Sequence, residues 1–207
     1  INYISYFNVS RADVAGIEFE FNKRLGNIFK TENKSISGFS VGGNISYLYS
    51  NINIDLNEIA KEDKQTANTL ANITNQERQL QGASPLLLNG SITYDSLLIP
   101  KSKSTSISLV YNRFASRIFS AGTFTSGDMY EKGFGTLDFV FMNSWNSGFN
   151  IRFRVRNILN PNIERYQSPS ISDTQDFSNQ GNVITQSFKT GINFGITIGY
   201  KFGLGKD

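Results

Sequence analysis

Glu18 and Glu20 are the first residues of the chain whose type and spacing could do chemistry. They stand two residues apart in the segment GIEFEFNKRL (residues 16–25). Glycosidases use such a pair of carboxylates as acid and base, but they take the two groups from separate elements that flank the sugar. Residues two apart on one strand point to the same face, so we expect these carboxylates to line a charged wall rather than to catalyse a reaction.

Histidine and cysteine are both missing from the 207 residues. Without histidine the chain lacks the usual general base, the commonest metal ligand and any Ser-His-Asp triad. Without cysteine it can form no disulfide, thiolate metal site or thiol nucleophile. We therefore predict that the protein is not an enzyme and has no catalytic residues, no metal site and no cofactor.

Three arginines, Arg152, Arg154 and Arg156, alternate with apolar residues in the segment FNIRFRVRN (residues 149–157). On one face of a strand they would form a cationic ladder about 13 Å long. Such a ladder could bind an anionic substrate or an acidic partner. The alternative, which we favour because buried charges are normally paired, is an ion-pair network. Its carboxylates would be Glu18, Glu20 or Asp138.

The elements that must carry these residues are strands of alternating polarity. In TGINFGITIGYKF (residues 190–202), large apolar residues occupy every second position, and polar or small residues lie between them. This period of two is typical of a β-strand with one apolar face. The alternation lasts about eleven residues, about twice the usual length of a strand in a soluble protein. We predict strands at residues 1–8, 16–25, 38–50, 86–97, 105–114, 134–145, 149–157 and 188–202.

The strand pattern leaves two all-β interpretations open. The strands could form a half-buried sheet of a soluble protein, such as a lipocalin-like binder. They could also form an antiparallel transmembrane β-barrel, with lipid on the apolar face and a lumen on the other. A helical membrane protein is excluded, because no window approaches the roughly 18 apolar residues of a membrane helix. Strand length favours the barrel, since about 9–11 residues of tilted strand cross a bilayer.

Short and long connections alternate along the chain. NSG (residues 146–148) has the composition of a tight hairpin turn, and LIPKSK (residues 98–103) is also short. Long polar segments follow Ser50, Phe114 and Asn157. Short turns at one rim and long extracellular loops at the other are typical of outer-membrane barrels. Residues 57–82, in the first long segment, form either a ligand-gripping loop or a solvated loop, and we favour the latter.

The barrel interpretation assigns faces to the charged and aromatic residues. An arginine on the lipid face would cost about 2–4 kcal/mol at the midplane, so the charged side chains are expected to face the lumen. The lumen-facing candidates are Glu18, Glu20, Asp138, Arg152, Arg154 and Arg156. Aromatic rings near strand ends are expected in the two membrane interfaces. These interfacial candidates are Tyr47, Tyr49, Tyr94, Tyr111, Tyr200 and Phe202.

Several stretches occur in a characteristic order along essentially the whole chain. They are ADVAGIEFEFNKRLG, RQLQGASPLLLNGSITYDS, YNRFASRIFSAG, DMYEKGFGTLDF, VRNILNPNIERYQ and GINFGITIGYKF. In this order they resemble TonB-dependent outer-membrane receptors, most closely those of the Bacteroidetes type. The first stretch, for example, is similar to the A-x-x-x-G-(I/V)-E-(L/F)-E-x-x-K strand of these receptors. EKGFG departs from their usual E-x-P-R pattern.

The resemblance implies a receptor in the Gram-negative outer membrane that imports a scarce ligand, using a TonB-box and the proton-motive force. The chain would supply about the last eight strands of a 22-stranded barrel, with the N-terminal plug domain absent. The expected ligands are siderophore-iron, cobalamin, a glycan or a peptide. The expected partners are outer-membrane lipid, the rest of the barrel, the plug domain, TonB through the missing N-terminal part, and a surface lipoprotein.

Two other barrel arrangements remain open. The chain could be an autonomous eight-stranded barrel with a structural or adhesive role, or a receptor-like barrel subunit of a larger outer-membrane assembly. Small inward residues would leave a narrow barrel poorly packed, which favours a wide wall. They are Gly42, Ser46, Ser91, Gly195 and Gly199. A net charge of +3 without a basic stripe gives no reason to expect a nucleic-acid partner.

Overall fold

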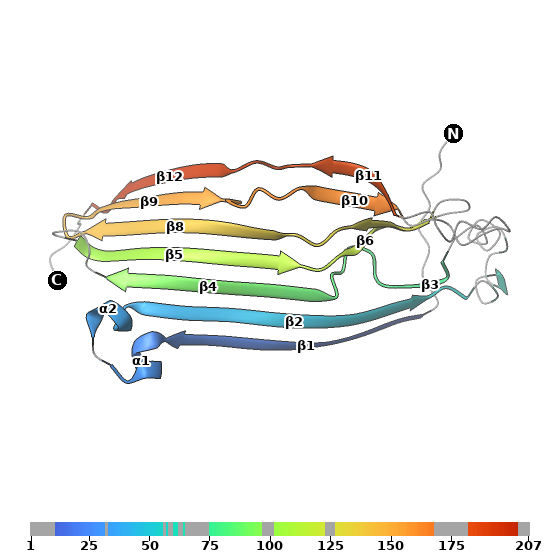
Figure 1. Ribbon diagram of the computed structural model, residues 1–207, viewed down its shortest axis with the longest axis horizontal. Coiled ribbons are helices and arrows are strands. Elements are labelled where there is room, and N and C mark those ends of the chain that lie inside the picture. Colours follow the sequence, from blue (N-terminus) through green and yellow to red (C-terminus); the bar gives the residue numbers. More distant parts are fainter. Residues whose placement is uncertain are drawn as a thin grey trace.

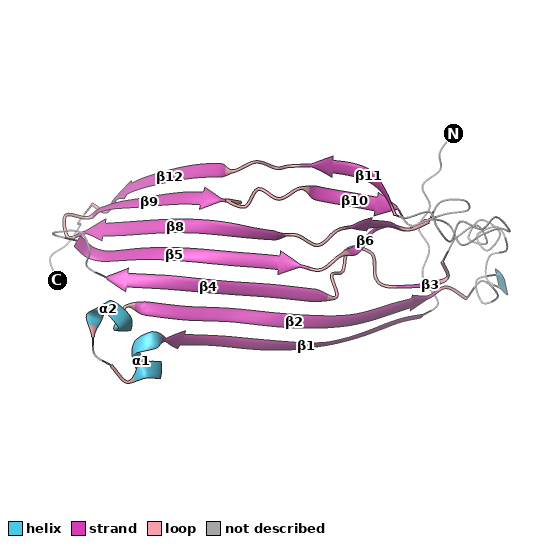
Figure 2. Ribbon diagram, viewed as in Figure 1, coloured by secondary structure: helices cyan, strands magenta, loops and turns pink. Residues whose placement is uncertain are grey.

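Antiparallel β-strands make up most of the described chain, which confirms the all-β prediction (Figure 2). A computed structural model describes residues 11–31, 33–55, 75–96, 102–122, 127–167 and 182–202, together with residues 57, 60, 61 and 64. The strand predicted at residues 1–8 lies outside the described residues.

The main sheet is a meander of seven long strands, which lie side by side in Figure 1. In spatial order they are β1 (Arg11–Arg24), β2 (Phe39–Asn53), β4 (Leu86–Ser96), β5 (Ser102–Phe114), β8 (Gly135–Trp145), β9 (Phe149–Arg156) and β12 (Asn193–Tyr200). The short strand β3 (Glu77–Arg78) pairs with the end of β2. Each long strand overlaps one of the predicted strands, although β1 begins well before residue 16.

A second, four-stranded sheet lies beyond the end of the main sheet at which β5 and β9 terminate. Its order is β11 (Val183–Phe188), β10 (Ile163–Gln167), β7 (Met129–Glu131) and β6 (Arg117–Ser120). Figure 1 shows β10 nearly in line with β9, and β11 nearly in line with β12. The segments expected to be loops after Phe114 and Asn157 therefore contain strands, and the strand predicted at 188–202 is interrupted between residues 188 and 193.

The interruptions between the two sheets are built from specific hydrogen bonds. Asn157 has a positive φ of 58° and is buried. Its backbone N–H donates to Asp138 Oδ1 at 2.9 Å, and its Nδ2 donates to Thr190 Oγ1 at 3.0 Å and to the Gly191 carbonyl at 2.8 Å. Asn157 thus ties the interruptions of neighbouring strands together, and Asp138 takes part in this structural contact.

Connection length differs between the two ends of the main sheet. At one end lie the helices α1 (Leu25–Phe29) and α2 (Lys34–Ser37), and the turn between β8 and β9. This turn, at residues 146–148, closes with a hydrogen bond of 3.1 Å from the Gly148 N–H to the Trp145 carbonyl. The longer connections of the main sheet, from β2 to β4, from β5 to β8 and from β9 to β12, all leave and rejoin it at the opposite end (Figure 1). We call these the short-connection end and the long-connection end.

The sheet has very little interior of its own. Among the described residues, the buried apolar side chains are Ile54, Ile118 and Ile163, all near the long-connection end. Every extensive contact between strands joins hydrogen-bonded neighbours, so no second layer covers either face of the main sheet in the described residues. A domain normally buries a sheet face against another layer, and the described residues supply no such layer here.

Gly148 should be difficult to replace. Its φ of 88° is left-handed, and a Cβ there would lie 2.6 Å from the Lys201 carbonyl oxygen. Since the left-handed conformation alone costs about 1–2 kcal/mol for other residues, we expect Gly148→Ala to lower the free energy of unfolding by at least that amount. Urea unfolding followed by fluorescence of Trp145, the one tryptophan, measures the change.

The control for this change is Gly90→Ala, because a Cβ at Gly90 would meet nothing within 4 Å. We expect it to alter stability by less than about 0.5 kcal/mol. Equal stability of the two variants would contradict the assigned turn geometry.

Candidate functional site: a sheet with one apolar and one polar face

The register aligns most of the large apolar residues of the seven long strands on one face of the main sheet, although Leu48, Val110, Val140 and Met142 lie on the other face. Phe194 lies opposite Val155, which lies opposite Phe139. Leu109 and Ile92 continue this row into β5 and β4. Directly opposed residues share a face, so the alternation in each strand adds up to one surface. We call it the apolar face; its other members include Phe19, Ile45, Tyr47, Leu88, Ile107, Tyr111, Leu137, Phe141, Ile151, Phe153, Ile196, Ile198 and Tyr200.

Much of the apolar face is open. Ile17 is 74% exposed, Phe194 72% and Ile196 67%, and even Ile92 in the middle of the sheet is 51% exposed. Burial of apolar surface contributes about 25 cal/mol per Å², so an uncovered face of this width loses a large stabilisation. Extended exposed apolar patches of this kind mark contacts with membranes or with other proteins.

The six aromatic residues singled out from the sequence share the apolar face and divide between its two ends. Tyr47, Tyr49 and Tyr111 lie toward the long-connection end. Tyr94, Tyr200 and Phe202 lie toward the short-connection end, and Phe202 follows the last residue of β12. Their positions fit two aromatic belts, whereas their contact with a membrane interface stays a prediction.

Sequence reasoning missed three further rings at the short-connection end. Phe39 packs on Tyr94 with ring centroids 4.4 Å apart, and Trp145 packs on Phe149 at 5.2 Å. Each of the three is the first or last residue of its strand and keeps the alternation of that strand, which was the available signal. Together with the Tyr200–Phe202 pair at 4.9 Å, they form a row of aromatic pairs along this end.

The opposite face of the main sheet, the polar face, carries a ladder of amides and hydroxyls. Asn44 Nδ2 donates to Glu18 Oε1 at 2.8 Å, and Asn89 Nδ2 donates to Asn44 Oδ1 at 2.5 Å. In the neighbouring strands, the hydroxyls of Thr93 and Ser108 lie 3.0 Å apart. Glu18 therefore meets amides rather than guanidinium groups.

The three arginines of β9 lie on the polar face but do not form the expected ion-pair network. Arg152 lies opposite Thr197, and its Nε donates to Met142 Sδ at 3.2 Å. None of the ion pairs in the described residues includes Arg152, Arg154 or Arg156. The carboxylates proposed as their partners are engaged or distant: Asp138 binds the Asn157 N–H, while Glu18 and Glu20 lie on β1 near the other edge of the sheet.

A buried polar cluster around Asp128 was missed from the sequence. Asp128 is 1% exposed and accepts hydrogen bonds from three parts of the chain. Asn75 Nδ2 donates to it at 2.6 Å, Arg78 at 3.3 Å and the Gly122 N–H at 2.7 Å. Residues 75–84, taken from the sequence as the end of a solvated loop, are in fact anchored: the Gly82 N–H also bonds the Ile118 carbonyl at 2.8 Å.

A second cluster crosses the four-stranded sheet at Glu131, which is 5% exposed. Arg117 approaches one carboxylate oxygen at 2.6 Å, and Arg165 approaches the other at 3.4 Å. The Arg165 guanidinium also lies 3.6 Å from the centroid of the Phe119 ring. These residues come from three strands that are distant in sequence, so no local motif could have revealed them.

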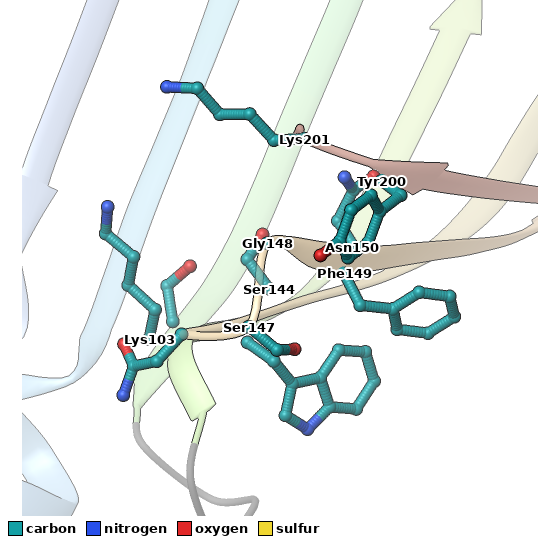
Figure 3. A pocket seen from close by; sticks show the side chains of 11 residues that line it. Lys103, Ser144, Ser147, Gly148, Phe149, Asn150, Tyr200 and Lys201 are labelled. Carbon is teal, nitrogen blue, oxygen red and sulfur yellow. The ribbon is translucent and has the colours of Figure 1, made fainter. Parts of the chain in front are cut away.

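A pocket of about 570 Å³ lies at the short-connection end, around the turn at residues 146–148. Lys103 and Lys201 line it beside Asn150 and Tyr200. In Figure 3 the two lysines extend to one side of the turn and Phe149 to the other. No carboxylate is among its described lining residues, which offer ammonium groups, amides and hydroxyls.

The described residues contain no group of three or more acidic side chains placed to hold a metal ion. Among them, no helix has the length and apolar character needed to cross a membrane. No protein-family profile, no curated protein and no solved structure matches the chain. The expectations of no enzymatic activity, no cofactor and no metal thus stay predictions.

Removing the Asp128 carboxylate should free the segment at residues 75–84. Asp128→Ala leaves Arg78, whose side chain is 9% exposed, without its carboxylate. Breaking a buried pair from one side costs about 3–5 kcal/mol, so we expect much faster hydrogen exchange at the Leu80 and Gly82 amides. The control Asp13→Ala breaks the exposed pair with Arg11, which contributes no more than about 1 kcal/mol. Unchanged exchange in Asp128→Ala would contradict the anchoring role.

Proposed function

We propose that this chain forms part of the wall of an antiparallel transmembrane β-barrel in the outer membrane of a Gram-negative bacterium. The observation that carries the proposal is the apolar face, which runs across all seven long strands while the polar face carries charges, amides and hydroxyls. In a soluble sheet the apolar face would need a protein layer over it, and no described element provides one. In a barrel the same face meets lipid.

Strand length supports a membrane-spanning wall. β1, β2, β4, β5 and β8 contain 14, 15, 11, 13 and 11 residues. A strand tilted by about 45° needs about 9–11 residues to cross a bilayer, while strands of soluble proteins usually have about five or six. The shorter β9 and β12 are prolonged beyond their interruptions by β10 and β11.

The unequal ends of the sheet support an orientation. Outer-membrane barrels have short periplasmic turns and longer extracellular loops. The short-connection end, with its aromatic pairs, would lie at the periplasmic interface. The long-connection end, with the clusters around Asp128 and Glu131, would carry the loops outside the cell. These two clusters would hold the bases of the extracellular loops in place.

The edges of the sheet support a wall that continues into further strands. In the described residues, β1 pairs only with β2, and the long edge strand β12 pairs only with β9. An open edge invites pairing with another strand, because its backbone N–H and C=O groups are unsatisfied. A narrow, closed eight-stranded barrel would instead pair one edge with the other, and would have to fill its interior over the small residues of the polar face.

Within this class we propose a TonB-dependent receptor of the Bacteroidetes type, on the basis of the sequence resemblance. It would import a siderophore-iron complex, cobalamin, a glycan or a peptide. The polar face would look into a lumen that holds the plug domain and the ligand path, and Arg152, Arg154 and Arg156 would offer unpaired cations there. TonB and a surface lipoprotein would act through other parts of the protein. The alternative of a receptor-like barrel subunit uses the same two-faced wall.

Ile45 and Ser46 test the assignment of the two faces, because they are consecutive residues of β2 that point to opposite sides. On the lipid face an arginine costs free energy that reaches about 2–4 kcal/mol at the bilayer midplane and falls toward the interfaces, so we expect Ile45→Arg to lose about 1 kcal/mol or more of folding free energy in phospholipid vesicles. Ser46→Arg places the same side chain on the polar face, opposite Glu18, and should change stability little. Urea titration with protease protection as the readout measures both.

Equal costs for the two variants would contradict the assignment of lipid to one face. A neutral Ile45→Arg would sink the proposal altogether, because it would mean that water reaches this face in the folded protein.

A further inference from the structure

Arg113 is a charged residue on the apolar face, where the register also places Arg11, Asp13 and Lys23 of β1. The register places it opposite Leu88 of β4 and Gly135 of β8, in a row that continues to Ile45 and Phe19. The Arg113 side chain is exposed, and no described carboxylate pairs with it. An unpaired guanidinium on a lipid-facing surface is costly unless it finds water or an anion.

A shallow pocket of about 380 Å³ lies beside Arg113 on the same face. Its polar lining includes Lys132 and the tyrosine Tyr111, and its apolar lining includes Phe134 and Leu159. Leu159 is 52% exposed. A cationic group therefore stands next to open apolar surface, which is the combination that an amphipathic anion requires.

Gly133 and Gly135 allow the backbone to approach closely at this pocket. A Cβ on Gly135 would lie 2.5 Å from Tyr111 Oη, so the tyrosine ring covers the glycine. A Cβ on Gly133 would collide with the Phe114 carbonyl oxygen. The Gly133 N–H is held by Ser116 Oγ at 3.1 Å. The pocket is thus a fixed feature of the interruption between β7 and β8.

Lys132 brings a second cation to the pocket. Its Nζ donates to Glu164 Oε2 at 2.9 Å, and this hydrogen bond and the charge of Glu164 raise the pKa of Lys132. The lysine therefore stays protonated at neutral pH. The local balance is two cations against one carboxylate, so the pocket keeps a net positive charge.

The position of Arg113 along its strand corresponds to a membrane boundary. It follows Ser102, the first residue of β5 at the short-connection end, by 11 positions. At about 3.3 Å per residue this is about 36 Å along the strand, or about 26 Å across a membrane at a tilt near 45°. If the short-connection end lies at one interface, Arg113 lies at the other, because the apolar band of such barrels is about 25 Å tall.

We propose that Arg113 and Lys132 bind the phosphate of a membrane lipid at the long-connection boundary, with the acyl chains lying along the neighbouring apolar face. This inference rests on the proposed membrane location and names the lipid chemistry of that surface. A guanidinium can donate two parallel hydrogen bonds to phosphate, and an ammonium adds a point charge. A free phosphate would make no use of Phe134 and Leu159, whereas a lipid would cover both.

The test uses the complete native protein in a neutral detergent, titrated with phosphatidic acid or phosphatidylcholine, and native mass spectrometry counts the retained lipids. We expect tighter retention of phosphatidic acid, and about tenfold weaker retention after Arg113→Gln, since a charge-assisted hydrogen bond is lost. Arg152→Gln is the matched control, because it removes an unpaired arginine from the polar face. It should leave lipid retention unchanged.

Each other outcome would overturn the inference. Equal retention of both lipids, or equal loss in the two variants, would mean that general charge rather than this pocket attracts lipid. Displacement of phosphatidic acid by millimolar inorganic phosphate would mean that a free anion is the ligand. Reconstitution of the same preparation into vesicles, with protease protection, separates these failures from failure of the barrel itself: a protein that inserts but lacks lipid preference contradicts the lipid site alone.

Discussion

The whole structure depends on a single constraint: seven strands keep most of their large apolar side chains on the same face of one layer, and no described element covers that face. The register joins Phe194, Val155 and Phe139 across three strands, and the row continues to Ile92. A one-residue slip of any strand would move its apolar residues to the polar face. The surroundings of the sheet therefore select its register, and the same surroundings must supply the stabilisation that a protein core would otherwise give.

The polar groups of the polar face and of the long-connection end are held by hydrogen bonds between strands and between distant segments. Asn44 and Asn89 relay hydrogen bonds from Glu18 across the sheet, and Asn157, between β9 and β10, bonds both to β8 and to the interruption between β11 and β12. Asp128 and Glu131 are buried and satisfied by groups from distant segments. These contacts fix the described segments of the long-connection end relative to one another.

The long strands could be predicted from the sequence because each carries its own alternation, as β12 does in Asn193–Tyr200. The short strands β6, β7, β10 and β11 could not, because segments such as MYE and IERYQ are too short to show a period. Their pairing depends on non-local groups such as Glu131 with Arg165. The prediction of an ion-pair network around the three arginines was wrong for a related reason. Residue spacing places Arg152 on the correct face, but it carries no information on how many strands separate Arg152 from Glu18.

The proposed lipid-facing wall is tested most directly by measuring whether each residue of β12 is exposed to lipid or to water. The chain contains no cysteine, so single cysteines from Asn193 to Tyr200 can each carry a spin label without background. In outer-membrane vesicles we expect labels at Phe194, Ile196 and Ile198 to collide with oxygen, which concentrates in lipid, and those at Gly195 and Thr197 to collide with a polar nickel chelate or to be shielded by protein. We predict that the ratio of oxygen collisions to chelate collisions alternates between high and low from one residue of β12 to the next. Equal access of the chelate to both sets, or shielding of the apolar set from both reagents, would contradict a lipid-facing wall.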